Sequence, residues 1–182
     1  LDQLATSDSQ GRGITQTLNT TRALYQAVTE YVDELVEIKR HEIEHLSKQI
    51  FLTITNKPNE YAGVYVKEDY TLQVYRHDNT TVENEQLSAG EKEVLAYSFI
   101  TALNLSSINP APFVMDTPFG HLDAGHRRGL LDSLPRLGVQ VFLLATDRDL
   151  PEDERGRIQH CIAQEFVLDR DQQRALSRIR EA

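Results

Sequence analysis

Apolar residues recur in steps of four and three between residues 14 and 50, and this spacing constrains the fold more than any other feature of the chain. Such a pattern is typical of a coiled coil or a long amphipathic helix. A helix of ~37 residues would be about 55 Å long at 1.5 Å per residue, so its apolar stripe needs a partner. The sequence leaves two partners open: a second coiled-coil helix, or the surface of the chain's own domain. The stripe comprises Ile14, Leu18, Thr21, Tyr25, Val28, Val32, Leu35, Ile43, Leu46 and Ile50.

This stripe divides the chain into three parts. Residues 1 to 13 are polar, contain two glycines and show no apolar periodicity, so we expect a flexible tether there. Residues 14 to 50 form the expected coiled-coil stub. Residues 51 to 182 are long enough to bury a core of their own, and we expect them to form one globular lobe.

Charge and composition exclude several classes of protein. The 182 residues include 28 acidic and 19 basic side chains, which gives a formal net charge of −9. No basic field covers the whole chain to bind nucleic-acid phosphates, although a local patch or a partner chain could still do so. No window is apolar enough for a membrane helix, and the single cysteine excludes an internal disulfide framework. We therefore expect a cytoplasmic protein with no membrane partner.

Beyond residue 56, patterns of strands and helices alternate, which predicts an α/β fold. An uninterrupted apolar run at residues 139–145 indicates a strand covered on both faces, as in a mostly parallel sheet flanked by helices. The other expected elements are a hairpin over residues 64–74, a helix over 88–104, a buried strand over 113–115, a helix over 125–137 and a tail helix over 152–163.

The segment Leu87-Ser88-Ala89-Gly90-Glu91-Lys92 stands directly before the helix expected at residues 88–104. Ser88 and Glu91 have the spacing of a capping box, which by itself indicates only a well-started helix. The small residues Ala89 and Gly90 would also let an anion approach the free N–H groups of the helix start. A phosphate group is the natural ligand for such a site.

A second segment, from Ala111 to Asp123, ends a predicted strand with Asp116. A carboxylate at the carboxyl end of a buried strand lies where α/β sheets bind ligands, and it can hold Mg²⁺ through water. Aspartates at strand ends also cap helices, so Asp116 alone is a weak signal. The order of the glycine-bearing segment, the strand-end aspartate, Leu122-Asp123 and a further strand leading to Thr146-Asp147 is far more specific.

These motifs resemble the ABC-type ATPase heads of the SMC superfamily, which includes double-strand-break-repair ATPases and RecF- and RecN-like proteins. Residues 87–92 resemble the ABC signature, residues 113–116 the Walker B strand, and Leu122-Asp123 the D-loop. Asp147 falls where the switch histidine belongs. Within the superfamily, the string from Asp116 to Asp123 is most similar to the DndD family, the ATPases of DNA phosphorothioate modification.

The resemblance implies the C-terminal lobe of a P-loop ATPase head that uses ATP and Mg²⁺. The sequence contains no Gly-x-x-x-x-Gly-Lys-Ser/Thr, so the Walker A loop would come from an N-terminal lobe. Further implied partners are a second identical head, DNA, and other DNA-modification or nuclease subunits. In this interpretation Ser88, Ala89, Gly90 and Glu91 bind nucleotide, Asp116 holds Mg²⁺ through water, and Asp123 couples two sites across the interface between heads.

Two departures from the family pattern bear on hydrolysis. Thr117 stands where a glutamate usually activates water, and it is not an effective general base. Asp147 replaces the usual histidine. Asp147, His121 or Asp123 could orient water instead, with Asp147 favoured because it follows the second apolar strand. For His121, an ordinary loop side chain is the favoured interpretation. The alternatives to an ATPase in DNA modification are a nucleotide-gated scaffold with little turnover and a DNA double-strand-break-repair ATPase.

Overall fold

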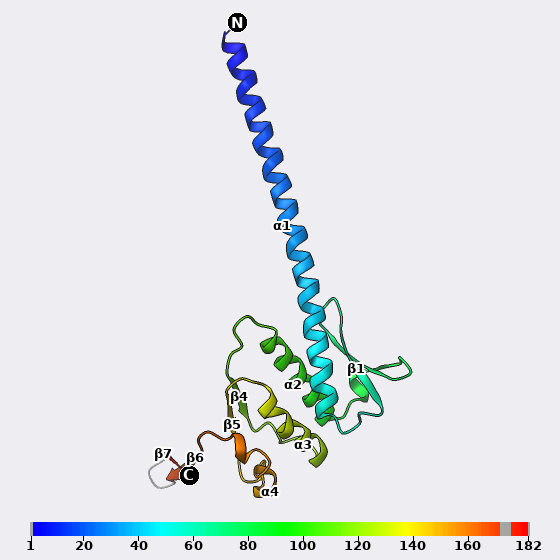
Figure 1. Cartoon of the computed structure of the whole chain (residues 1–182), viewed down its shortest axis with the longest axis vertical. Helices are drawn as coiled ribbons and strands as arrows, with labels where there is room; N and C mark the ends of the chain where they lie inside the picture. The colour runs from blue at the N-terminus through cyan, green and yellow to red at the C-terminus, as the bar shows by residue number, and fades with distance from the viewer. Residues whose placement is uncertain (1, 172–175, 182) are drawn as a thin grey trace.

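The computed structural model describes residues 2–171 and 176–181. One long helix, α1 (Asp2–Ile54), projects from a small body that surrounds its C-terminal end (Figure 1). All residues from 14 to 38 are exposed, and we call this stretch the arm. Its apolar stripe includes Leu18 at 53% and Tyr25 at 73% exposure. The arm therefore does not lie across its own domain, and its stripe is left for another helix to cover.

Helix α1 begins at Asp2, so residues 2–13 continue the helix where the sequence indicated a separate tether. The physical reason is that the segment contains no proline, and its two glycines weaken a helix without breaking it, so the helix that follows propagates through them. Leu1 lies outside the described residues.

A small antiparallel sheet is attached to the base of the arm. Strands β1 (Tyr61–Val66), β2 (Leu72–Arg76) and β3 (Thr81–Val82) pair in that order, which confirms the expected hairpin. Arg40 is buried and donates from Nη1 to the Val66 carbonyl at 2.8 Å, while the Glu44 carboxylate accepts the Val66 N–H at 2.9 Å. Because both backbone groups of one strand end are bound by α1 side chains, the sheet is fixed to the helix.

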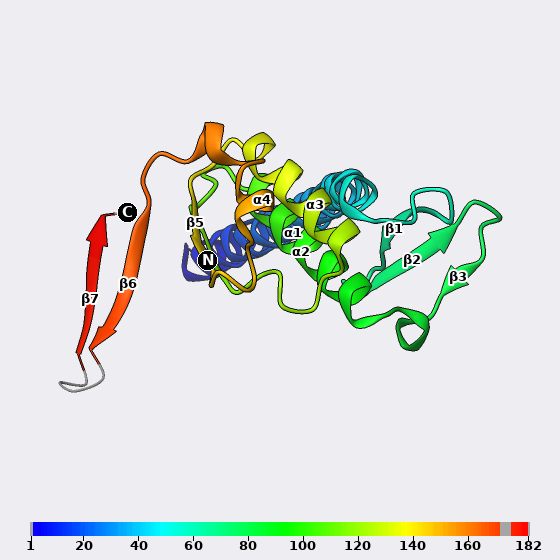
Figure 2. The same ribbon diagram turned by 90° about the horizontal axis from the view of Figure 1, so that it is seen from below.

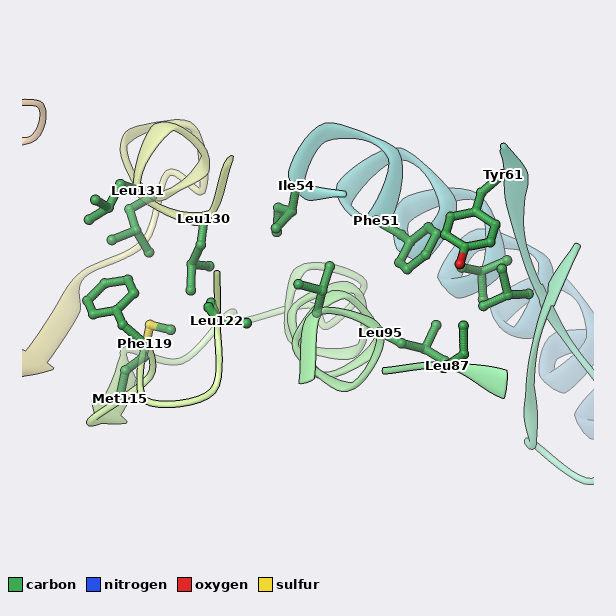
Figure 3. Close-up of a cluster of buried hydrophobic side chains, with 14 of the residues drawn as sticks. Phe51, Ile54, Tyr61, Leu87, Leu95, Met115, Phe119, Leu122, Leu130 and Leu131 are labelled. Atoms are coloured by element: carbon green, nitrogen blue, oxygen red, sulfur yellow. The ribbon is translucent and has the colours of Figure 1, made fainter. Parts of the chain in front are cut away.

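Two helices pack on the last turns of α1 and build the core. The expected signature helix is α2 (Ala89–Leu105), and a short 3₁₀ turn, η1 (Asn84–Gln86), precedes it. Helix α3 (Ala124–Ser133) continues into the 3₁₀ turn η2 (Leu134–Arg136). Figure 3 shows side chains of the core gathered on both sides of α2, among them Phe51, Ile54, Leu95, Leu122 and Leu130.

The approach between α3 and α1 is unusually close. A β-carbon at Gly129 would lie 2.5 Å from the backbone oxygen of Ile54, a distance that no side chain tolerates. Glycine at this position therefore lets the two helix backbones meet, and it anchors α3 to the end of α1.

Strands β4 (Phe113–Asp116) and β5 (Val141–Leu144) form the one parallel pair within the described residues; the other ladders there are antiparallel. Only one face of the pair is covered. Met115 packs in the core, whereas Val114, Phe142 and Leu144 are 69%, 49% and 53% exposed. The expectation of strands buried on both faces was therefore wrong for this chain, because no described element covers the second face.

The tail is less helical than its sequence indicated. The expected helix over residues 152–163 is a single turn, α4 (Glu152–Arg155), followed by a 3₁₀ turn, η3 (Gln159–Cys161). This segment lacks the repeated apolar positions that would hold a longer helix against the core. Strands β6 (Phe166–Asp171) and β7 (Leu176–Glu181) then pair as a hairpin that projects from the end of the body opposite the β1–β3 sheet (Figure 2). None of the helices in the described part combines the length and apolarity needed to cross a bilayer.

Candidate functional site

The start of α2 is an exposed tip built on a buried carboxylate. Ser88 is the N-cap, its hydroxyl accepts the Glu91 N–H at 3.3 Å, and the Glu91 carboxylate accepts the Ser88 N–H at 2.8 Å. The capping box expected from the sequence is thereby confirmed. Ser88 and Ala89 are exposed, whereas Gly90 and Glu91 are buried. Of these four residues, Ser88 and Ala89 are the ones that a ligand at the tip can reach directly.

Glu91 fixes this tip to the base of the β-sheet. Its Oε1 accepts the Tyr61 hydroxyl at 2.7 Å and lies 2.9 Å from the Lys57 ammonium, and the side chain is 2% exposed. Burial by itself would raise the pKa of Glu91, but the hydrogen bonds from Lys57, the Ser88 backbone and Tyr61 outweigh it and lower this pKa to about 2. Burial and the same carboxylate raise the pKa of the Tyr61 hydroxyl. Glu91 is thus a buried, ionised anchor.

Gly90 packs against the loop that follows β4. A β-carbon there would lie 3.1 Å from the His121 carbonyl oxygen and 3.7 Å from His126 Nδ1. The sequence indicated that the glycine admits an anion, but in this structure its small size admits the backbone of loop 117–123. The tip of α2 and this loop are therefore in direct contact, although they lie some thirty residues apart in sequence.

Asp116 ends β4 and begins this loop. Its side chain is exposed at the carboxyl end of the strand, as the sequence predicted. Thr117 follows with a φ of 47°, a left-handed conformation that costs a β-branched residue energy. Its N–H still donates to the Leu144 carbonyl of β5 at 2.8 Å, and its carbonyl accepts the Gly120 N–H at 3.3 Å. The chain turns sharply here and runs back toward Gly90.

Asp123 closes the loop and caps α3. Its Oδ1 accepts the N–H groups of Gly125 and His126 at 2.8 and 2.9 Å, and its Oδ2 accepts Asn56 Nδ2 at 2.8 Å and lies 3.0 Å from His126 Nδ1. Partial burial acts to raise the pKa of Asp123, but hydrogen bonds and the charge of His126 lower it. The carboxylate is therefore occupied within the chain and links loop 117–123 to the end of α1.

The other two catalytic candidates lie at the surface. His121 is 78% exposed, and its Nδ1 lies 3.7 Å from Oε2 of Glu93. Asp147 is exposed in the turn after β5, where the Thr146 hydroxyl bonds to Asp149 rather than to Asp147. Because Asp116 pairs in register with Leu144, the loops after β4 and β5 leave the same end of the sheet. The structure thus brings Asp116, His121 and Asp123 into one loop beside Gly90, with Asp147 in the adjacent turn.

The carboxylates of this site are compatible with a Mg²⁺ ion that is also bound by a nucleotide. No group of three or more histidine, cysteine, aspartate or glutamate side chains among the described residues could hold a metal ion without help. Mg²⁺ commonly uses one or two carboxylates and completes its shell with water and phosphate oxygens. The single exposed carboxylate of Asp116 fits that role.

A cavity of about 300 Å³ lies beside Asp116, between α2 and β4. Its lining is mainly apolar, but it includes two carboxylates, Glu93 and Asp116. The carboxylate atom Oε2 of Glu93 is buried and accepts no hydrogen bond within the described structure, and burial raises the pKa of this group. The Glu93 side chain as a whole is 34% exposed, so only one of its oxygens is withdrawn from water. Sequence reasoning missed Glu93, because a glutamate on a helix is ordinarily a solvated residue and only the tertiary contacts bury this oxygen.

Sequence comparison finds relatives among DNA-repair ATPases, while no family model matches the chain. A DNA double-strand break repair Rad50 ATPase from Halobacterium salinarum is 27% identical over 133 residues, which are 66% of this chain and 15% of that protein. The Rad50 ATPase of Methanosarcina mazei is 32% identical over 50% of this chain and 10% of its own length. A DNA replication and repair protein RecF from Rhizobium rhizogenes is 37% identical over 40% of this chain and 20% of its own. The chain therefore spans about one tenth to one fifth of these relatives.

Solved structures agree with these relatives. A chain from a study of ATP-driven dimerization and DNA-stimulated activation of SMC ATPases superposes with a TM-score of 0.62 at 14% identity, over 82% of this chain and 88% of that one. The protein has the fold of an SMC head domain. An Smc head of Pyrococcus yayanosii, with a coiled coil and joint, gives a TM-score of 0.60 at 15% identity over 88% of this chain and 32% of that one. The sequence relatives are thus Rad50 and RecF proteins, and the structural neighbours are SMC heads.

Within an SMC head fold, two contacts escaped the sequence interpretation. His126 is 2% exposed and binds Asp123, and Asn56 binds the same carboxylate from the end of α1. The spacing Asp123-x-x-His126 at the start of a helix was an available signal, because residues three apart share a helix face. Asn56 had no comparable local signal, since its partner lies 67 residues away.

Proposed function

We propose that this chain is the C-terminal lobe of an SMC-like head that binds and hydrolyses ATP between two associated heads. The observation that carries the proposal is the contact between the α2 tip and loop 117–123, within a fold of SMC-head type. That contact puts a helix start suited to phosphate and a strand-end carboxylate suited to Mg²⁺ on one connected unit. A ligand bound at either element can therefore move the other.

In this proposal each residue has a limited task. Ser88 and Ala89 present the exposed helix start to the γ-phosphate of a nucleotide held by the opposing head, and Gly90 and Glu91 hold that tip in place. Asp116 holds Mg²⁺ through water, and the ion neutralises charge on the phosphates. Asp123 keeps loop 117–123 in position at the interface. Phosphoryl transfer depends mainly on such positioning and charge stabilisation.

The 182-residue sequence contains no Walker A loop, so the proposal requires a further lobe that supplies one. The exposed face of the β4–β5 pair supports such a lobe. A two-stranded parallel sheet is ordinarily covered on both faces. Here Val114, Phe142 and Leu144 form an exposed apolar face that ends at Asp116. We assign this face to the N-terminal lobe that carries the Walker A loop, and the arm to a second coiled-coil helix.

The proposed ATPase activity is tested by measuring steady phosphate release. The chain is first combined with the lobe that carries the Walker A loop. We expect Asp116→Ala to abolish turnover, while Asp153→Ala, a change at another exposed aspartate, leaves it unchanged. Turnover that survives Asp116→Ala would refute the proposed role of Asp116. Replacing Asp147 or His121 then distinguishes the two surface candidates for orienting water.

One observation favours a second candidate, a nucleotide-gated scaffold. Thr117 follows Asp116 where a general base is expected, and its hydroxyl cannot take a proton efficiently at neutral pH. In that case ATP closes two heads without steady hydrolysis. Light scattering that shows ATP-dependent association, together with no phosphate release, would establish the scaffold over the enzyme.

The names of the relatives support DNA as the substrate on which the head acts. Rad50 ATPases of double-strand break repair and RecF of replication and repair are the matched proteins. We propose phosphorothioate modification as the specific pathway, because of the string from Asp116 to Asp123, with modification or nuclease subunits as partners. Mass spectrometry of digested DNA from a strain that lacks the gene tests it. Loss of backbone sulfur supports modification, and unchanged sulfur together with sensitivity to strand breaks supports repair.

A further inference from the structure

The cavity beside β4 has the form of a socket for one long, positively charged side chain. Its walls are Ala96, Tyr97 and Ile100 of α2 on one side and the residues of β4 on the other. Its volume of about 300 Å³ exceeds that of one large side chain. The cavity is open to solvent along exposed Ile100 and Val114, so a segment of another lobe can enter it beside the open strand.

The backbone of β4 is open on the side away from β5. The N–H groups of Phe113 and Thr117 donate to carbonyls on the β5 side at 2.9 and 2.8 Å. Since alternate residues of a parallel strand bond to the same neighbour, the backbone groups of Val114 and Asp116 face the opposite edge. No strand pairs with that edge in the described part of the chain. An extended segment can therefore bind there by backbone hydrogen bonds.

Glu93 gives this apolar socket its charge preference. A buried carboxylate oxygen without a hydrogen-bond donor is costly, and such groups are ordinarily paired. The one basic side chain within 4.0 Å of this carboxylate among the described residues is His121, at 3.7 Å, and that ring is largely in solvent. Asp116 adds a second carboxylate to the lining. The cavity thus combines an apolar wall for a methylene chain with negative charge for its end, which matches lysine or arginine.

We propose that a lysine or arginine side chain of the lobe that completes the head enters this cavity and pairs with Glu93. The inference rests on the proposed function, because that function requires a second lobe. The matched part makes up only 10–20% of these relatives, so each of them contains much chain beyond it. The exposed apolar residues Ile100 and Val114, at 56% and 69%, lie at the same cavity and would be covered by the same segment.

The socket can be tested on the 182-residue chain alone with two small probes of equal length, n-hexylammonium and hexan-1-ol. Their affinities are measured from amide chemical shifts of α2 in 150 mM salt. We expect the cation to bind about tenfold more tightly than the alcohol, because both fill the apolar cavity and only the cation pairs with Glu93. In Glu93→Gln the preference should fall to about twofold or less, which is the part left to Asp116 at the cavity. Glu85→Gln, which removes an exposed glutamate outside the cavity, should retain the tenfold preference.

A variant that fills the cavity distinguishes binding inside it from general attraction of the cation to the negatively charged surface. Ala96→Leu keeps a good helix former and occupies part of the socket, so it should weaken both probes at least fivefold. Equal binding of the two probes to the wild-type chain, or a cation preference that stays near tenfold in Glu93→Gln, would overturn the inference. So would a Walker A lobe that binds the wild-type chain and Glu93→Gln with the same affinity. None of these measurements involves nucleotide, so their failure leaves the hydrolysis test with Asp116→Ala intact, and the converse also holds.

Discussion

Glu91→Gln is the substitution whose effect follows most directly from the structure. The two carboxylate oxygens accept hydrogen bonds from the Tyr61 hydroxyl, the Lys57 ammonium and the Ser88 N–H. Glutamine keeps one acceptor oxygen but turns an N–H₂ group toward one set of donors. One bond is therefore lost, a buried donor is left unpaired, and the remaining bonds lose the charge that strengthens them. Together these effects should cost about 3 kcal/mol.

The pKa of Glu91 gives a second value for the free energy that its carboxylate contributes to stability. Its pKa falls from the ordinary value of 4.5 to about 2 in the folded chain. At 1.36 kcal/mol for each factor of ten, this difference corresponds to about 3 kcal/mol of stability. Because the folded pKa lies below the unfolded one, the contribution is complete above pH 4.5 and disappears as the pH falls toward 2. Near pH 3.5 it should have dropped to about 2 kcal/mol.

Urea denaturation at pH 7 and pH 3.5 measures both effects. With a slope of about 2 kcal/mol per molar urea, Glu91→Gln should lower the midpoint by about 1.5 M at pH 7 and by about 1 M at pH 3.5. The matched control is Glu93→Gln, two residues along the same helix. Burial raises the pKa of Glu93 and its Oε2 accepts no hydrogen bond in the described structure, so the control should change the midpoint by less than about 0.3 M. Equal losses in the two variants would refute the buried-anchor role of Glu91.

Three further substitutions test other parts of the structure. Gly129→Ala should destabilise the chain by about 3 kcal/mol or more in urea denaturation, because its β-carbon would overlap the backbone of Ile54; Gly156→Ala, whose nearest neighbour is 3.6 Å away, should change stability by less than about 0.5 kcal/mol. Thr117→Gly should stabilise the chain by about 1 kcal/mol, since glycine adopts a φ of 47° without strain, and a lower melting temperature would contradict this. Phe142→Ser should leave the stability of the lone chain within about 0.5 kcal/mol yet weaken binding of the Walker A lobe at least tenfold by calorimetry, because this ring is half exposed until a partner covers it.

Local patterns predicted local structure well. The capping box of Ser88 and Glu91 depends on two residues three apart, and its geometry is confirmed. The hairpin over residues 64–74 likewise follows from alternation around a turn. The helix expected over residues 125–137 is present as α3 and the turn η2, and Gly138 follows it with a left-handed φ of 67°.

Contacts between distant segments could not be predicted in the same way. The sequence offered an anion as the reason for the glycine at position 90, whereas the structure shows the backbone of His121 against it. An apolar run indicates burial but not which segment provides it, so the sequence could not show that one face of β5 stays exposed in this chain. Asp123 is a comparable case. The sequence identified it as part of a motif, but its hydrogen bond to Asn56 depends on how α1 packs against α3.

The arm gives small movements at its base a large effect. Residues 14–38 extend about 37 Å at 1.5 Å per residue beyond the point where burial begins. If α1 and α3 tilt together by ten degrees, the far end of this stretch is displaced by about 6 Å. Because the backbones of Gly129 and Ile54 meet without intervening side chains, little of such a tilt is absorbed at the pivot. The arm can therefore act as a lever, in which a small tilt at its base becomes a displacement of about half a helix diameter at its far end.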